Sequence, residues 1–108
     1  MRIILLAVLV TGCGTVCDGA VAAETGANQK AAGCNAGSIT VHDANKCNDG
    51  IKTKCTNDDL RGIQSYSSCL NGLPACTSSN EQQFSGQRQG CINQAARDIS
   101  LTCFSAIL

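Results

Sequence analysis

The chain has 108 residues, nine cysteines and a formal net charge of zero at pH 7, but no tryptophan, one tyrosine and only two phenylalanines. A balanced charge argues against electrostatic capture of nucleic acid or anionic membrane, because both require a basic surplus on one face. Since so few large apolar side chains bury little surface, the chain needs covalent cross-links to offset the entropy cost of folding.

The N-terminal residues have the pattern of a secretory signal. A basic residue precedes an apolar run from Ile3 to Val10, and the small residues that end at Ala23 are typical of a signal-peptidase site. The run is far shorter than the ~20 residues that span a bilayer. We therefore predict a signal peptide at 1–23 and a single domain at 24–108, whose first ten residues form a small, polar and mobile leader.

Cleavage after Ala23 leaves seven cysteines. In an exported chain of this size they predict a disulfide framework, built from Cys34, Cys47, Cys55, Cys69, Cys76, Cys91 and Cys103. Three disulfides use six of them, and the seventh is then either a free thiol or a link to a second chain in a covalent homodimer. The sequence does not fix the pairing. By helix rise, Cys55 and Cys91 are best matched in distance from the hairpin turn that Cys69 and Cys76 flank.

A third explanation of the odd number places the processing site earlier. Val10-Thr11-Gly12-Cys13 resembles the lipobox of bacterial lipoproteins, in which the cysteine is lipidated and becomes the first mature residue. Cleavage there leaves Cys17 together with the seven, an even eight. The resemblance implies a lipid on Cys13 that anchors the protein to a membrane surface without spanning it.

The middle of the chain begins with an ambiguous segment. Residues 38–42 alternate in the manner of a strand, but no second strand pattern exists to pair with them, so we expect no stable strand. From Asp43 onward, apolar residues and cysteines recur at helical spacing, and Asp43 is suited to cap a first turn. We predict a helix over 43–54, weakened by Gly50.

A helical hairpin forms the predicted centre of the domain. Its first helix covers 57–71, is capped by Asn57 or Asp58, and ends at Gly72, where we expect the left-handed conformation. A thin apolar stripe at 3.6-residue spacing runs along this helix.

The second helix of the hairpin covers 79–106 and begins at an SxxE pattern that fits a capping box. Gly86 and Gly90 each cost roughly 1 kcal/mol relative to alanine in a helix interior, so a break at 86–90 is the alternative. The predicted fold class is therefore all-α, a small disulfide-rich helical hairpin or three-helix domain.

Few residues are candidates for catalysis or metal binding. His42 is the only histidine, and although Asp43 could orient it, a surface histidine is the favoured interpretation because a base needs a positioned partner. No serine lies in a GxSxG turn, and no cysteine pair has zinc-finger spacing. The run from Asn45 to Gly50 begins like a calcium loop, but Thr56 stands where a bidentate glutamate belongs. We expect no catalytic residue, cofactor or metal.

These features predict a secreted, cysteine-rich protein that acts by extracellular binding without catalysis, as a toxin-like or pheromone-like soluble ligand. The alternative is a structural component of the extracellular matrix or cell surface. One form of it is a lipoprotein that is anchored through Cys13. The predicted partner is an extracellular protein or surface, with no nucleic acid, and with a membrane only if the chain is lipidated. The apolar C-terminal residues 101–108 are expected to dock onto the domain's own core. If Ile107 and Leu108 are exposed, they are the first surface to test for a partner.

Overall fold

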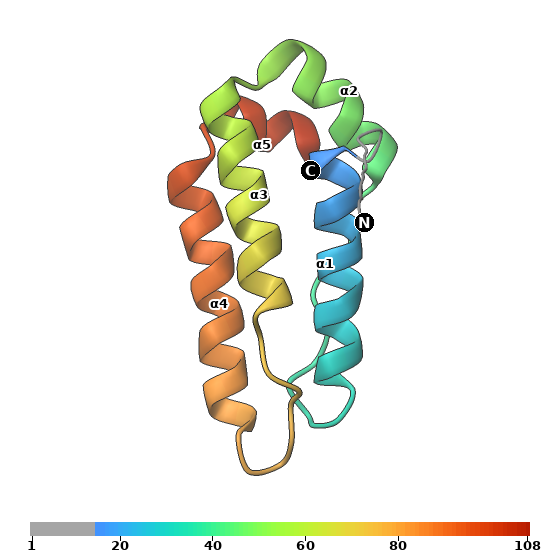
Figure 1. Cartoon of the computed structure of the whole chain (residues 1–108), viewed down its shortest axis with the longest axis vertical. Coiled ribbons are helices and arrows are strands. Elements are labelled where there is room, and N and C mark those ends of the chain that lie inside the picture. The colour runs from blue at the N-terminus through green and yellow to red at the C-terminus, as the bar shows by residue number, and fades with distance from the viewer. Residues whose placement is uncertain (1–14) are drawn as a thin grey trace, which may run out of the picture.

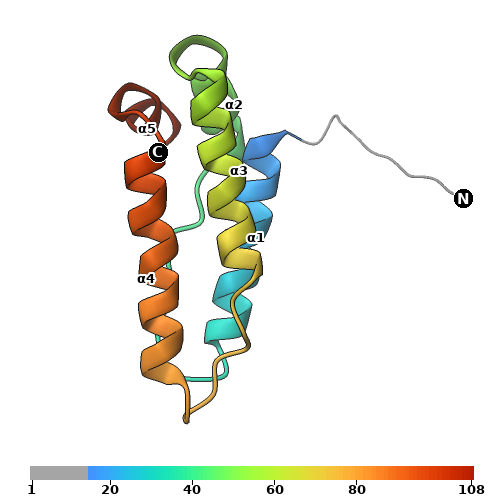
Figure 2. The same cartoon turned by 60° about the vertical axis from the view of Figure 1, so that its left-hand side comes forward.

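Figure 1 shows the computed structural model of the protein, which describes residues 15–108. Over this range the protein is all-α, as the sequence predicts. Its helices are α1 (Val16–Ala31), α2 (Ala44–Lys54), α3 (Asn57–Asn71), α4 (Glu81–Asp98) and α5 (Leu101–Ile107). The long helices α1, α3 and α4 run side by side with α3 in the middle, and α2 and α5 lie together at one end (Figures 1 and 2). The fold thus has more helices than the predicted hairpin or three-helix domain.

Helix α1 occupies a part of the chain where the sequence predicts no helix. The Thr15 hydroxyl accepts a hydrogen bond from the Asp18 amide, and the Asp18 carboxylate accepts one from the Thr15 amide, so a capping box starts the helix. The predicted mobile leader at 24–33 is therefore wrong. Small side chains spaced four residues apart form the buried face of the helix instead, namely Ala23, Ala27 and Ala31.

The predicted signal peptide ends inside α1. Residues 1–14, which include its apolar run and Cys13, lie outside the described residues. Cleavage after Ala23 would divide α1 and remove Cys17, which forms a disulfide with Cys47. The described fold is thus that of a chain that keeps Cys17, and the processing site stays a prediction.

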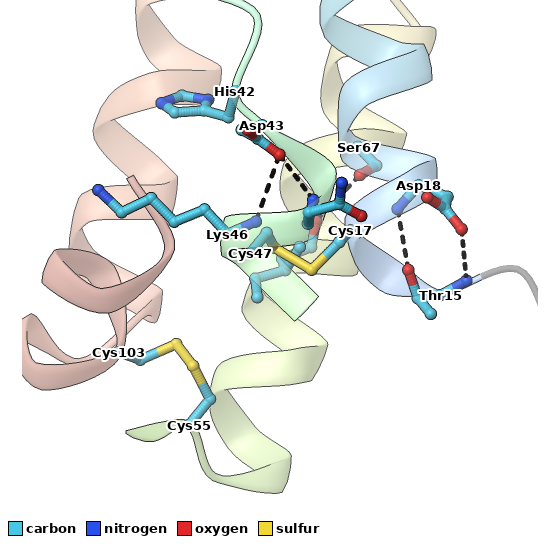
Figure 3. Close-up of a disulfide and its surroundings, with 12 residues drawn as sticks. Thr15, Cys17, Asp18, His42, Asp43, Lys46, Cys47, Cys55, Ser67 and Cys103 are labelled. Atoms are coloured by element: carbon cyan, nitrogen blue, oxygen red, sulfur yellow. Dashed lines mark hydrogen bonds between the residues drawn. A yellow bond between two sulfur atoms is a disulfide. The ribbon is translucent and has the colours of Figure 1, made fainter. Parts of the chain in front are cut away.

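Four disulfides connect the helices, and they pair all eight cysteines of the described residues within one chain, as Cys17–Cys47, Cys34–Cys76, Cys55–Cys103 and Cys69–Cys91. The sequence predicted three disulfides and one odd cysteine. The difference is Cys17, which supplies the partner that the seven lack. Figure 3 shows the two disulfides that fasten the ends of α2, one to α1 and the other to α5.

The predicted match of Cys55 with Cys91 is wrong, because the connection between α3 and α4 is not a compact turn. Cys91 pairs with Cys69, and Cys55 pairs with Cys103. The connection runs through residues 72–80, and α4 extends past the end of α3 (Figure 1). Cys91 lies about 15 Å along α4 from its first residue, which brings it level with the last turn of α3.

The ends of α3 also differ from the prediction. Thr56 caps the helix in a capping box with Asp59, so neither Asn57 nor Asp58 is the cap. Gly72 closes the helix in the right-handed region, with φ at −81°, and not in the left-handed one. Its amide bonds to carbonyls of the last turn, and the chain continues away from the helix without the reversal that a left-handed residue provides.

The predicted helix 79–106 is two helices. The predicted capping box between Ser78 and Glu81 does not form, because the helix begins after Asn80 without a side-chain cap and the Glu81 carboxylate accepts from the Asn35 amide instead. The break falls after α4, where the Ser100 hydroxyl accepts from the Cys103 amide and starts α5. The two glycines considered as breakpoints lie inside α4.

Two small apolar clusters form the core. One surrounds Phe84 and Leu70 and includes the buried alanines of α1. The other surrounds Ile63 and Ile99, near the end where α2 and α5 lie. Tyr66 packs against both clusters, so α3 joins the two halves of the interior.

The glycines of α3 and α4 give a test of this packing. A Cβ on Gly62 would lie 2.9 Å from the Ile99 side chain and 3.1 Å from the Asp98 carbonyl oxygen, whereas a Cβ on Gly86 would meet nothing within 4 Å. We expect Gly62→Ala to lower the free energy of unfolding by about 1–3 kcal/mol through overpacking. We expect Gly86→Ala to raise it by about 0.5–1 kcal/mol through helix propensity. Equilibrium urea unfolding measures both, and a stabilising Gly62→Ala would contradict the close approach.

Candidate functional site

A cavity of about 420 Å³ lies between α1, α3, α4 and α5. Residues 38–42, the extended segment between α1 and α2, complete its wall. The lining is mainly apolar and comes from every helix around it, with Val21, Ile39, Ile63, Ile92, Ala95, Ile99, Phe104, Ile107 and Leu108. A few polar side chains interrupt this lining, namely Glu24, Ser38, Thr40, His42 and Tyr66.

Side chains of two helices hold the extended segment in place. Asn28 of α1 donates to the carbonyl of Ile39 at 2.9 Å and accepts from its amide at 2.8 Å. Arg88 of α4 donates to the carbonyls of Ala36 and Gly37, each at 2.8 Å. The segment is not a strand, as expected for a stretch with no second strand to pair with. Side chains form hydrogen bonds with its backbone groups instead.

Glu24 is the polar centre of the cavity wall. Its side chain has no exposed surface. One carboxylate oxygen accepts from the backbone amide of His42 at 2.9 Å, and the other accepts from His42 Nδ1 at 2.6 Å and from the Tyr66 hydroxyl at 2.7 Å. A buried carboxylate is tolerated only with such donors, so this residue joins α1, the extended segment and α3.

The protons of this cluster follow from its geometry. Burial raises the pKa of Tyr66, and the hydrogen bond and charge of Glu24 raise it further, so the phenol keeps its proton and donates. When the Glu24 carboxylate is ionised and accepts all three of these bonds, the shared proton lies on Nδ1 of His42. In a neutral imidazole, Nε2 is then an acceptor. This nitrogen makes no hydrogen bond to any described residue.

The structure thus gives His42 a role that the sequence did not. Its carboxylate partner is Glu24, 18 residues away, and not the neighbouring Asp43, which caps α2 as predicted. The His42 side chain is 30% exposed and lines the cavity, so it is only partly at the protein surface. Ser38 and Thr40 line the same cavity, but neither forms a hydrogen bond to the imidazole among the described residues.

One other group of side chains has the composition of a metal site. Cys55, Asp59 and Cys103 bring two sulfurs and a carboxylate oxygen within 4.8 Å of one another. The two sulfurs are joined in a disulfide, which removes their thiolates. The Asp59 carboxylate accepts from the amides of Thr56 and Ser100, both at 2.8 Å, and from the Ser100 hydroxyl at 3.0 Å. This group therefore fastens α5 to the start of α3.

The residues singled out from the sequence are distributed over the whole fold. The seven cysteines are all in disulfides, and Cys47, with Cys17, lies on the cavity wall. Cys13, the predicted lipidation site, lies outside the described residues. No role for Glu24 was predicted from the sequence, although it lies on the same face of α1 as Cys17 and Ala20, at spacings of seven and four residues.

The C-terminal residues divide between core and surface. Cys103 is fully buried, and Phe104 and Ile107 pack against the cluster around Ile63, as expected for a terminus that docks onto its own domain. Leu101 is 80% exposed and Leu108 is 44% exposed. The end of the chain therefore forms part of the cavity wall and leaves two leucines accessible to solvent.

No protein-family model, curated protein or solved structure matches the chain. None of the described helices combines the length and the apolar character that crossing a bilayer requires. The four disulfides make it a small cysteine-rich protein of the kind found in oxidising, extracellular surroundings. The cavity is therefore the feature of the protein that bears on its function.

The Asp59 contacts predict a loss of stability in acid. Hydrogen bonds from the backbone of Ser100, and then of Thr56, hold the pKa of Asp59 below its usual 3.8. Because the folded-state pKa is lowered, the stabilisation is present above the unfolded value and is lost as the pH falls through the folded one. Asp59→Asn should unfold at lower urea concentration than wild type at about pH 7, and the difference should shrink below about pH 4.

Asp58 provides the matched control for this experiment. Its side chain is 83% exposed and pairs only with Arg61 on the same helix, which is 70% exposed. Asp58→Asn should therefore change the urea midpoint little at either pH, because exposed ion pairs contribute little. Equal effects of the two substitutions would contradict the role of Asp59.

Proposed function

We propose that the protein acts outside the cytoplasm as a non-catalytic binding protein whose cavity holds a small apolar molecule. The observation that carries the proposal is the cavity of about 420 Å³, with its mainly aliphatic lining and its single buried polar cluster. Small-molecule sites typically have this size and this combination of apolar wall and few placed polar groups. The helices around the cavity are tied by disulfides, so the site is largely preformed.

The absence of catalysis is part of the proposal. Proton transfer by His42 would require a reacting group positioned at Nε2. The cavity hydroxyls of Ser38 and Thr40 make no hydrogen bond to the imidazole, so no nucleophile is activated there. A hydrolytic activity that disappears in His42→Ala would contradict this part of the proposal.

The soluble-ligand role, toxin-like or pheromone-like, is a narrower form of the same idea. A carrier in solution can deliver its small molecule to a receptor or surface, and the receptor contact itself stays a prediction. The exposed Leu101 and Leu108 are the first surface on which to test it, because large apolar side chains favour contact with a partner.

A second candidate concerns where the protein is held. The four-disulfide fold uses Cys17 and so favours processing upstream of it. The lipobox-like stretch that ends at Cys13 provides such a site, and lipidation there would anchor the binding domain to a membrane surface. This anchored form is the cell-surface alternative predicted from the sequence.

The cavity predicts saturable binding of an apolar probe. The exported, disulfide-bonded protein should bind 1-aminonaphthalene, a fluorescent probe small enough for this cavity, with one site per chain, measured by the change in probe fluorescence. Ala20 of α1 lines the cavity, and a phenylalanine there fills part of it. We expect Ala20→Phe to weaken binding by about tenfold or more, because the added ring takes volume from the ligand.

Ala22→Phe is the matched control, since Ala22 lies on the exposed face of the same helix. It should leave probe affinity unchanged, and circular dichroism should show that both variants remain helical. Equal affinity of the two folded variants, or no saturable binding by wild type, would exclude the cavity as a binding site.

The two processing alternatives predict different masses for the native protein. Intact-mass and N-terminal analysis should place the first residue before Cys17, because the Cys17–Cys47 disulfide belongs to the fold. Anchoring predicts that this residue is Cys13 with added acyl chains, and that Cys13→Ser releases the protein from membranes. A native start at Glu24, with seven cysteines left, would contradict the four-disulfide fold.

A further inference from the structure

We propose that the ligand held in this cavity is an aliphatic alcohol whose hydroxyl group donates a hydrogen bond to Nε2 of His42. This inference rests on the proposed function, since the cavity must first accept small apolar molecules. It adds the chemical class of the ligand and the atom that recognises it.

The other polar atoms of the cluster already form hydrogen bonds within the protein. The carboxylate of Glu24 accepts three hydrogen bonds, two from His42 and one from the Tyr66 hydroxyl. The Tyr66 proton is committed to that bond. The imidazole uses Nδ1 for Glu24, and its other nitrogen has no partner among the described residues. Nε2 is therefore the unsatisfied polar atom that the cluster presents.

Nε2 of His42 needs a particular kind of hydrogen-bond partner. A neutral imidazole with its proton on Nδ1 exposes a lone pair at Nε2, so it requires a donor. A hydrocarbon provides none and leaves the nitrogen of this 30% exposed side chain to solvent, so it gains nothing from His42. A carboxylate provides no proton either, and would bring a second negative charge near the buried Glu24. A hydroxyl group donates without adding charge.

The volume of the cavity limits the size of the ligand. Water occupies roughly 30 Å³ per molecule in the liquid, so a cavity of about 420 Å³ accommodates roughly ten to fourteen non-hydrogen atoms. The apolar lining includes Val21 of α1, Ile92 of α4 and Phe104 of α5. A medium-chain alcohol fits both the volume and the apolar wall.

A pair of isomers tests the inference on the unmodified protein. Octanol and heptyl methyl ether contain the same atoms, but only octanol has a hydroxyl proton. By isothermal titration calorimetry at pH 8, octanol should bind roughly three- to tenfold more tightly than the ether, the value of one hydrogen bond.

Variants then assign the preference to one residue. His42→Phe should remove the difference between octanol and the ether, because Nε2 is lost. Thr40→Val removes another cavity hydroxyl with little change of volume, and it tests whether Thr40 makes the contact instead. Loss of the preference in Thr40→Val but not in His42→Phe would overturn the assignment to His42.

The single histidine of the chain allows a measurement that needs no variant. Proton–nitrogen correlation spectra of the imidazole should show the proton on Nδ1 in the free protein. Addition of octanol should move the Nε2 signal, and the ether should not move it. This keeps the inference testable if His42→Phe, which takes a donor from buried Glu24, does not fold.

The outcomes separate this inference from the proposed function. If neither isomer binds and the apolar probe does not bind, the proposed function fails and the inference with it. If both isomers bind equally and the Nε2 signal does not move, the cavity still binds apolar molecules but does not recognise a hydroxyl group. Tighter binding of octanoate than of octanol would overturn the alcohol assignment in favour of an anion.

Discussion

The disulfide between Cys17 and Cys47 fixes the first turn of α1 against α2, and much of the structure depends on that attachment. Helix α1 buries mainly alanine, which provides little apolar surface to hold the helix in place by itself. Yet α1 carries Asn28 and Glu24, which position the extended segment and the imidazole on the cavity wall. The covalent attachment of α1 therefore helps to hold the polar cluster in place.

Two buried charged side chains, from two different helices, hold the backbone between Ala36 and His42. Glu24 of α1 accepts the amide of His42, and Arg88 of α4 donates to the carbonyls of Ala36 and Gly37. Arg88 also lies over the ring of Phe84, 5.4 Å from its centre, where the aromatic face favours a cation. Each charge is thus paired with backbone dipoles, so the segment between them is rigid without belonging to a sheet.

The sequence was sufficient for the parts of the fold that depend on local signals. Asp43 caps α2 and the helix over 57–71 has its predicted length, because caps and helical periodicity act within a few residues. Helix α1 was missed because its buried face is made of alanines, which carry little apolar signal, and because it overlaps a signal-like stretch. Glu24 was missed with it, since its partners His42 and Tyr66 are distant in sequence and only tertiary structure brings them together.

The same cross-links explain how so small a protein can contain a cavity. A disulfide acts largely by restricting the unfolded chain, so its stabilisation does not require that the interior be filled. Packing does require it, because each empty volume in a core loses contacts. Here the disulfides connect α2 to α1 and α5, and α3 to α4, around the space that Ile63 and Phe104 line. Stability is thereby separated from close packing, and the interior volume becomes available for a ligand.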